Sequence, residues 1–176
     1  MTKVYLIRHT SVDVPPGTCY GQTDVPVKDT FPQEAAVSKA RIEGLHFDKV
    51  FTSPLTRCVQ LATFCGYPDA ERRKEIMELN FGKWEMVRYD ELHGEYADKW
   101  YADYFHTPAP EGESFVDQFQ RVSRFLEELK ASNYENVLVF AHGGVLACSL
   151  LYCGRVDSSD LFSHMPQYGE MITIEI

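Results

Sequence analysis

Three short, largely apolar segments of the chain each end at polar residues. The segments are 4–7, Lys49–Thr52 and 137–141, and they run into Arg8-His9, Ser53-Pro54 and His142-Gly143-Gly144, respectively. Apolar runs of this length with polar ends are typical of strands that are buried on both faces. The sequence therefore predicts three buried strands whose carboxyl ends carry polar side chains.

Stretches with helical periodicity lie between and after these strands. Apolar residues recur at helical spacing from Phe115 to Leu129, and Ser114 with Asp117 resembles a capping box, so we expect a helix over about 115–130. A second helix is expected over about 33–45. After the third strand, 145–151 has the pattern of a buried helix that begins at small residues, whose N–H groups can face a ligand.

The Ser53-Pro54 pair is a strong signal for a helix start. Serine is favoured as an N-cap, and proline is favoured at the first helical position. We expect Ser53 to cap a helix that places Arg57 in its first turn.

Strands that alternate with helices predict the fold class. We expect one α/β domain over 1–176, a three-layer α/β/α sandwich with a mostly parallel central sheet. Residues 171–176 alternate apolar and polar positions, as in a terminal strand with one exposed face. The aromatic-rich stretch over about 81–113 does not continue the pattern, and we expect it to be a small helical insertion closed by an irregular loop.

Composition narrows the possible functions. The chain has 176 residues with 17 Lys and Arg against 26 Asp and Glu, so its net charge of −9 argues against nucleic-acid or anionic-membrane binding. Its apolar runs are too short to span a bilayer, which needs about 20 residues. Five cysteines without a C-x-x-C pair, and no signal-peptide pattern, favour reduced thiols and a cytoplasmic location.

The strand ends together contain the groups that phosphoryl transfer requires. That reaction needs an in-line nucleophile, donors to the equatorial oxygens and an acid for the leaving oxygen. Because ligands bind at the carboxyl ends of parallel strands, Arg8, His9 and His142 should meet there. The aromatic residues of the insertion are expected mainly to pack, although they also offer a stacking surface.

The same residues resemble the signatures of the histidine phosphatase superfamily. The matching blocks are Arg8-His9-Thr10, Thr52-Ser53-Pro54-Leu55-x-Arg57, Glu78-Leu-Asn-Phe-Gly82-Lys-Trp84-Glu85 and Ala141-His142-Gly143-Gly144-Val145. The resemblance implies that His9 is the nucleophile, that Arg8, Arg57 and His142 bind phosphate with help from Gly143, and that Glu78 is the acid and base. Glu85 is the competing carboxylate, with a structural hydrogen bond as its alternative role.

Chemistry agrees with the roles that the resemblance implies. A nucleophilic imidazole must be unprotonated, and two guanidinium groups nearby disfavour the imidazolium, so we expect His9 to be neutral. Its other ring nitrogen should donate to a backbone carbonyl. His142, if protonated by the approaching phosphate, would add a third donor.

Thr10 replaces the glycine that commonly follows the family's histidine. Together with the segment Cys19-Tyr20-Gly21-Gln22-Thr23-Asp24-Val-Pro26, this variant resembles the alpha-ribazole phosphatases. By that analogy Gly21, Gln22 and Thr23 lie beside the phosphate, and hydrolysis of alpha-ribazole phosphate in cobalamin synthesis is the leading hypothesis.

Several alternatives stay open. A phosphoglycerate mutase would use the same residues, a broad-specificity sugar phosphate phosphatase is a second possibility, and a binding protein on this fold is a third. A cysteine phosphatase is disfavoured because no cysteine and arginine have the required spacing. No metal or other cofactor is expected, since no metal-ligand motif occurs. The expected partner is a small phosphorylated metabolite, and the sequence leaves the oligomeric state open.

Overall fold

A five-stranded sheet organises the protein. The computed structural model describes residues 1–176, and its strands lie in the order β3-β2-β4-β1-β5. The strands are β1 (Lys3–Arg8), β2 (Lys49–Thr52), β3 (Glu71–Arg72), β4 (Asn136–Ala141) and β5 (Met171–Glu175). All neighbouring pairs are parallel except β1 and β5. The predicted mostly parallel sheet is confirmed, and the terminal strand is its antiparallel edge.

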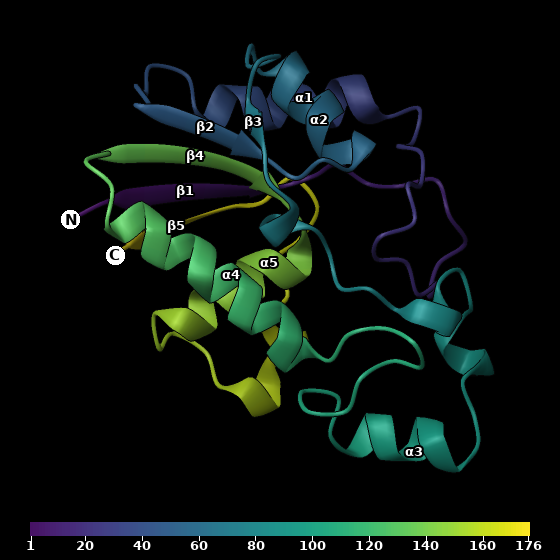
Figure 1. The fold of residues 1–176 in the computed structure, drawn as a ribbon. Coiled ribbons are helices and arrows are strands. Elements are labelled where there is room, and N and C mark those ends of the chain that lie inside the picture. Colours follow the sequence, from purple (N-terminus) through teal and green to yellow (C-terminus); the bar gives the residue numbers. More distant parts are fainter.

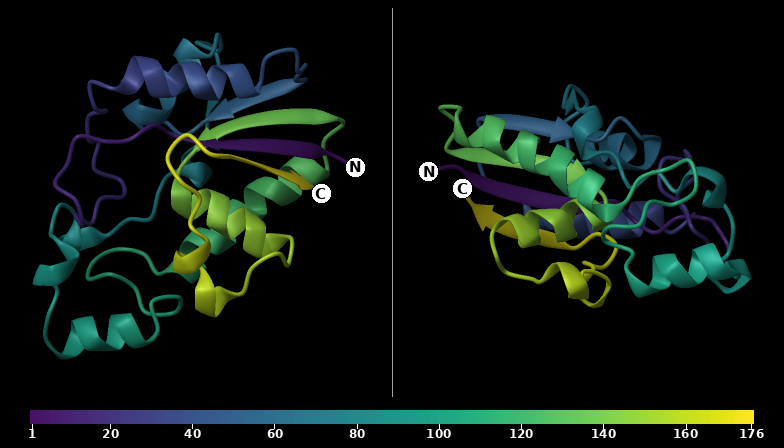
Figure 2. Two further views of the ribbon diagram at one scale, coloured as in Figure 1. Left: turned by 180° about the vertical axis from the view of Figure 1, so that it is seen from behind. Right: turned by 60° about the horizontal axis from the view of Figure 1, so that its bottom comes forward.

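Helices cover both faces of this sheet, as Figures 1 and 2 show. The helices are α1 (Phe31–Arg41), α2 (Thr56–Phe64), α3 (Glu95–Ala102), α4 (Phe115–Lys130) and α5 (Gly143–Tyr152). One core cluster joins the sheet to α1 and α2 through side chains such as Ile7, Leu61 and Phe140, and another joins it to α4 and α5. The three-layer sandwich is therefore confirmed.

The helix over 115–130 matches its prediction because local signals and packing agree. Ser114 accepts a hydrogen bond from the Asp117 backbone while the Asp117 carboxylate accepts one from the Ser114 backbone, which is a complete capping box. The apolar stripe of α4 faces the sheet, with Val122, Leu126 and Leu129 buried. The helix expected over 33–45 is shorter at its carboxyl end and spans Phe31–Arg41.

The prediction that Ser53 is the N-cap of the following helix was wrong. Helix α2 begins at Thr56, although Arg57 does lie in its first turn as expected. The Ser53 hydroxyl accepts a hydrogen bond of 3.3 Å from the backbone of Leu55, ahead of the helix, and it also lies 2.7 Å from Nε2 of His142. The carboxylate of Asp24, remote in the sequence, accepts hydrogen bonds from the backbone and hydroxyl of Thr56. A tertiary contact therefore supplies the acceptor that the local pattern assigned to Ser53.

The insertion lies to one side of the sandwich, where α3 stands apart from the sheet (Figure 1). Before α3 its ordered turns are 3₁₀ segments at Gly82–Trp84 and Tyr89–Glu91, and after α3 an irregular loop leads to α4. Trp100 of α3 is 1 % exposed, and aromatic side chains surround it in a separate core cluster. Further 3₁₀ segments lie at Lys74–Ile76, Ser158–Asp160 and Phe162–His164. Trp100 packs as expected, and several aromatic side chains of the insertion also line a cavity.

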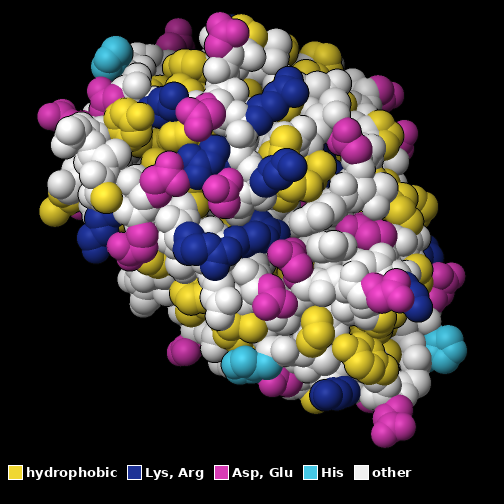
Figure 3. Space-filling model, viewed as in Figure 1, with side chains coloured by type: hydrophobic (Ala, Val, Ile, Leu, Met, Phe, Trp, Pro, Cys, Tyr) yellow, Lys and Arg dark blue, Asp and Glu magenta, His cyan; other side chains and the backbone are white.

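The surface carries charges of both signs. On the face shown in Figure 3, acidic and basic side chains are interspersed, and no large area has a single sign. None of the helices has the length and apolar character that crossing a bilayer requires. Attraction of an anion must therefore depend on a local site, and the strand ends provide one.

Candidate active site

His9 follows the last residue of β1 and is almost completely buried, with 1 % of its surface exposed. Its Nδ1 donates to the carbonyl of Thr10 at 2.7 Å, and its Nε2 accepts from Nε–H of Arg57 at 3.3 Å. Desolvation lowers the pKa of His9 well below its ordinary value, and the charges of Arg57 and Arg8 lower it further. The ring is therefore neutral, as the sequence predicted. Its unprotonated nitrogen, Nε2, is directed toward Arg57.

Arg57 is fully buried although it carries a permanent charge. Besides His9, its guanidinium contacts two backbone carbonyls: Nη1 donates to Thr23 at 2.9 Å and Nη2 donates to Gly21 at 2.5 Å. The ring of Tyr20 lies 5.3 Å from the guanidinium carbon. These contacts fix the orientation of the guanidinium beside His9 Nε2, so that it can meet an anion placed there.

His142 is the residue before α5 and is also fully buried. Its ring centroid lies 5.2 Å from that of His9, and its Nε2 contacts the Ser53 hydroxyl. Desolvation first, and then the nearby Arg57, hold the pKa of His142 well below its ordinary value. His142 is consequently neutral here, and an anion would have to bind before it could become the third charged donor that was expected.

Arg8 comes from the end of β1 and reaches the opposite side of the site. Its Nη1 donates to the carbonyl of Pro166 at 2.6 Å, and the ring of Tyr168 lies 4.2 Å from its guanidinium carbon. Its Nε is buried and has no hydrogen-bond partner in the protein. Gly143 lies so close that a Cβ there would be 3.0 Å from the Arg8 guanidinium carbon. The glycine therefore allows Arg8 and the start of α5 to share one site.

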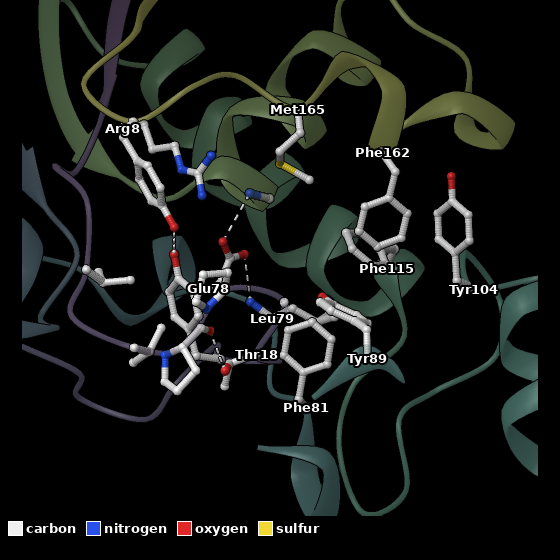
Figure 4. Close-up of a pocket in the computed structure, with 18 of the residues that line it drawn as sticks. Arg8, Thr18, Glu78, Leu79, Phe81, Tyr89, Tyr104, Phe115, Phe162 and Met165 are labelled. Carbon is white, nitrogen blue, oxygen red and sulfur yellow. Dashed lines mark hydrogen bonds between the residues drawn. The ribbon is translucent and has the colours of Figure 1, made fainter. Parts of the chain in front are cut away.

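Two tyrosines lie over His9, one from each end of the chain. The hydroxyls of Tyr20 and Tyr168 are 2.7 Å apart, and their rings lie 6.5 and 5.7 Å from the ring of His9. The dashed line between two phenolic oxygens in Figure 4 marks this contact. The pair therefore lies beside the almost completely buried ring of His9.

Glu78 lies between the sheet and the insertion, and backbone and side-chain donors hold its carboxylate. Oε1 accepts from the backbone of Leu79 and the amide of Gln118, both at 2.9 Å, while Oε2 accepts from the backbone of Gly144 at 3.2 Å. The last contact joins Glu78 to the first turn of α5, directly after His142. The structure therefore brings Glu78 to the same region as the strand-end residues.

Glu85 has different surroundings. Its carboxylate accepts hydrogen bonds from the backbone of Gly21 at 2.9 Å, the backbone of Gln22 at 2.8 Å and the hydroxyl of Thr23 at 3.0 Å. The Gln22 side chain donates to the backbone carbonyl of Glu78 at 3.2 Å. The segment 21–23 thus touches Arg57 and Glu78, while its backbone donors at Gly21 and Gln22 are occupied by Glu85.

A cavity of about 730 Å³ opens beside Arg8, Glu78 and Gly144. Its charged lining residues are Arg8, Lys28 and Glu78, and 13 of its 21 lining residues are hydrophobic. Figure 4 shows Arg8 and Glu78 on one side and a group of aromatic rings on the other. The aromatic side consists of Phe81, Tyr89, Trp100, Tyr101, Tyr104, Phe115 and Phe162. A ligand with an anionic end and a flat apolar body would match this division.

The sequence analysis gave no role at this site to Cys58, Gln118 and Tyr168. Tyr20, Asp24 and Ser53 belonged to the motifs, but no contact at the site was expected of them. Gln118 had a readable signal, because a polar residue occupies a position on the apolar stripe of α4. Cys58, whose thiol lies 3.5 Å from His142 Nε2, had none. No group of three or more His, Cys, Asp or Glu side chains is arranged to hold a metal ion.

Comparisons with known proteins identify the family of this chain. The model of the histidine phosphatase superfamily (branch 1) matches residues 4–176. An adenosylcobalamin/alpha-ribazole phosphatase of Escherichia coli (strain K12) is 32% identical over 155 residues, which are 82% of this chain and 75% of that protein. A 6-phosphofructo-2-kinase/fructose-2,6-bisphosphatase 1 of Rattus norvegicus is 30% identical over 162 residues, and the match covers 90% of this chain. The chain spans only about a third (34%) of that longer relative.

Solved structures show the same relationship. The alpha-ribazole phosphatase from Shigella flexneri has a TM-score of 0.89 at 25% identity, covering 99% of this chain and 91% of that one. A phosphoglycerate mutase from Thermus thermophilus has a TM-score of 0.78 at 28% identity, covering 99% and 93%. Fold and sequence therefore place this chain in the phosphoglycerate mutase-like class. The chain belongs to the histidine phosphatase superfamily.

Proposed function

We propose that the protein hydrolyses a small phosphomonoester whose leaving alcohol carries an aromatic base, and that this ester is alpha-ribazole 5'-phosphate. The observation that carries the proposal is the cavity, which joins Arg8 and Glu78 to a wall of seven aromatic side chains. Such a wall can stack on a benzimidazole base. The alpha-ribazole phosphatases among the similar proteins support the same substrate.

The proposed reaction begins at Nε2 of His9. This nitrogen attacks phosphorus, the bond from phosphorus to the ester oxygen breaks, and the oxygen leaves with the electron pair and takes a proton from Glu78. Arg8, Arg57 and His142 stabilise the charge on the transferred group. Because Nδ1 donates to the Thr10 carbonyl, only Nε2 is free to form the phosphohistidine.

The second half of the reaction returns the enzyme to its starting state. Water attacks the phosphorus of phosphohistidine, the nitrogen–phosphorus bond breaks, and Glu78 takes the proton from the water. Gly21, Gln22 and Thr23 support the phosphate site by holding Arg57 and the Glu78 segment in place. No step of this route requires a metal ion or other cofactor.

The main alternatives are a phosphoglycerate mutase and a sugar phosphate phosphatase of broad specificity. Phosphoglycerates and fructose bisphosphates carry a second anionic group, which would need a second cationic site. Lys28 is the only cation besides Arg8 that lines the cavity, and the remaining wall is mainly apolar. This composition favours a single phosphate on an apolar body over phosphoglycerates and fructose bisphosphates.

A panel of substrates tests the proposal directly. Phosphate release would be measured in excess EDTA with alpha-ribazole phosphate, phosphotyrosine, 3-phosphoglycerate, fructose 2,6-bisphosphate and ribose 5-phosphate. We expect the highest kcat/KM for alpha-ribazole phosphate and no turnover in a folded His9→Ala variant. Equal rates on all substrates would reject the assigned substrate, and isomerisation of phosphoglycerate faster than phosphate release would favour the mutase.

A further inference from the structure

Gln118 is a fully buried polar residue on the apolar face of α4. Its amide nitrogen lies 2.9 Å from Oε1 of Glu78 and 3.4 Å from the carbonyl of Met77. The thiol of Cys148 lies 4.0 Å from its amide oxygen. Burial of an amide in an apolar core costs free energy unless its polar atoms form hydrogen bonds. Here its stronger bond goes to the carboxylate that the proposed reaction uses as an acid.

The two oxygens of Glu78 have unequal surroundings. Oε1 accepts two hydrogen bonds of 2.9 Å, from Leu79 and Gln118, whereas Oε2 accepts a single bond of 3.2 Å from Gly144. A Cβ at Gly144 would lie 2.2 Å from Oε1 and 2.8 Å from the Gln118 amide, so a larger residue there would displace both groups. Oε1 is therefore the anchored oxygen, and Oε2 is the one left to exchange a proton with substrate.

The backbone beneath Glu78 is held separately. Arg121, one turn after Gln118 on α4, donates to the carbonyls of Glu75 at 2.8 Å, Met77 at 2.6 Å and Glu78 at 2.9 Å. Its Nε also pairs with the carboxylate of Glu113 at 2.8 Å. Arg121 thus fixes the path of the chain, while Gln118 is the one side chain that fixes the direction of the carboxylate.

We propose that Gln118 is a positioning residue that holds Oε1 of Glu78 so that Oε2 faces the leaving oxygen. The inference rests on the proposed function, because it assumes that Glu78 is the acid. Proton transfer requires the acid within hydrogen-bond reach of the leaving oxygen, and a carboxylate that rotates freely meets this condition for only part of the time. Loss of the Gln118 amide should therefore slow protonation of the leaving group and leave attack by His9 unchanged.

The choice of leaving group separates these two steps. 4-Nitrophenolate is a stable anion and departs without a proton, whereas the alkoxide of 2-phenylethyl phosphate needs one. In Gln118→Leu we expect kcat/KM for 2-phenylethyl phosphate to fall about tenfold or more, a part of the 10²–10⁴-fold that general acids contribute. For 4-nitrophenyl phosphate, kcat/KM should change less than about threefold.

A second measurement follows phosphohistidine. Since Glu78 also acts as the base for the attacking water, Gln118→Leu should accumulate phosphohistidine on His9 during turnover of 4-nitrophenyl phosphate, detected by mass spectrometry after a rapid quench. The matched control is Gln120→Leu, the same change at an exposed position of α4. It should leave both rates and the phosphohistidine level unchanged.

The variant should fold, because Met77 keeps its hydrogen bond to Arg121 and Glu78 keeps two backbone donors. Gln118→Met offers a flexible side chain of similar length should Leu pack poorly.

Glu78→Gln distinguishes a failure of the proposed acid role of Glu78 from a failure of the positioning role of Gln118. If it slows both substrates equally, the acid role of Glu78 is wrong. If it discriminates between them while both Gln118 variants slow them equally or not at all, the positioning role alone is overturned.

Discussion

The hydroxyl of Tyr20 lies 2.7 Å from the hydroxyl of Tyr168, 148 residues away in the chain, and the two rings close over His9. One ring lies against the guanidinium of Arg57 and the other against that of Arg8. His9 is 1 % exposed beneath them. The contact therefore joins the two sides of the phosphate site and limits access to the nucleophile.

Removal of this contact should expose His9. Tyr168→Phe keeps the ring over Arg8 but deletes the hydroxyl, and one hydrogen bond contributes about 1 kcal/mol, or about fivefold in an opening equilibrium. We expect diethyl pyrocarbonate to modify His9 about fivefold faster, as measured by mass spectrometry. Tyr96→Phe, which removes an exposed hydroxyl bonded to Pro108, is the control and should have no effect. An unchanged rate in Tyr168→Phe would show that the tyrosine pair does not limit access.

Stability should fall as the pH drops below the ordinary histidine pKa of 6.5. Burial holds the pKa values of His9 and His142 well below 6.5, so between those values and 6.5 the unfolded chain binds more protons than the native one. Each of the two histidines then lowers the free energy of unfolding by about 1.4 kcal/mol for each unit by which the pH falls. Above pH 7 both are neutral in either state and contribute no pH dependence.

Urea unfolding between pH 7.5 and 5.0 measures this slope. His9→Ala should remove about half of it, whereas alanine at the exposed His93 should leave it unchanged. Carboxyl protonation does not interfere in this window, because shifted carboxyl groups such as Glu34 and Asp48 have pKa values below 4.5. A native protein whose stability is flat from pH 7 to 5 would contradict the neutral, buried state of both histidines.

Arg57→Lys should be severe despite the retained charge. A single ammonium group cannot replace the three contacts that the guanidinium makes with His9, Gly21 and Thr23. Buried carbonyls would lose their donors, which should lower the free energy of unfolding by about 2 to 4 kcal/mol. Loss of a charge-stabilising donor should lower kcat/KM about 10²-fold or more. Arg72→Lys, at an exposed position of β3, is the matched control for urea unfolding and 4-nitrophenyl phosphate kinetics.

Glu85→Gln should affect stability rather than acid catalysis. The amide nitrogen of the variant would face donors that now bind the carboxylate, so the free energy of unfolding should fall by about 1 to 3 kcal/mol. The rates on 2-phenylethyl and 4-nitrophenyl phosphate should fall by the same factor, unlike those of Glu78→Gln. Glu91→Gln, at an exposed site, should change neither quantity. A selective loss on 2-phenylethyl phosphate would make Glu85, and not Glu78, the acid.

Much of the fold could be predicted because local and tertiary preferences agree. The apolar stripe and capping box of α4 place that helix at the residues where the structure has it. The predicted strand Lys49–Thr52 is likewise β2. At the start of α2 the local pattern and the tertiary packing disagree, and the tertiary contacts decide the structure. Ser53 contacts His142, and Asp24 accepts the hydrogen bond from the first residue of α2.

The sequence by itself determined where four of the five strands and the helices around them lie along the chain, the polar groups at the strand ends and the resemblance to one family. It did so because periodicity and motifs are local properties of the chain. Tertiary structure alone decided that Glu85 supports segment 21–23 while Glu78 joins Gly144, and that Tyr20 meets Tyr168 above His9. Those pairings depend on how distant segments pack, and hydrogen bonds between residues 64 to 148 positions apart leave no periodic trace in the sequence.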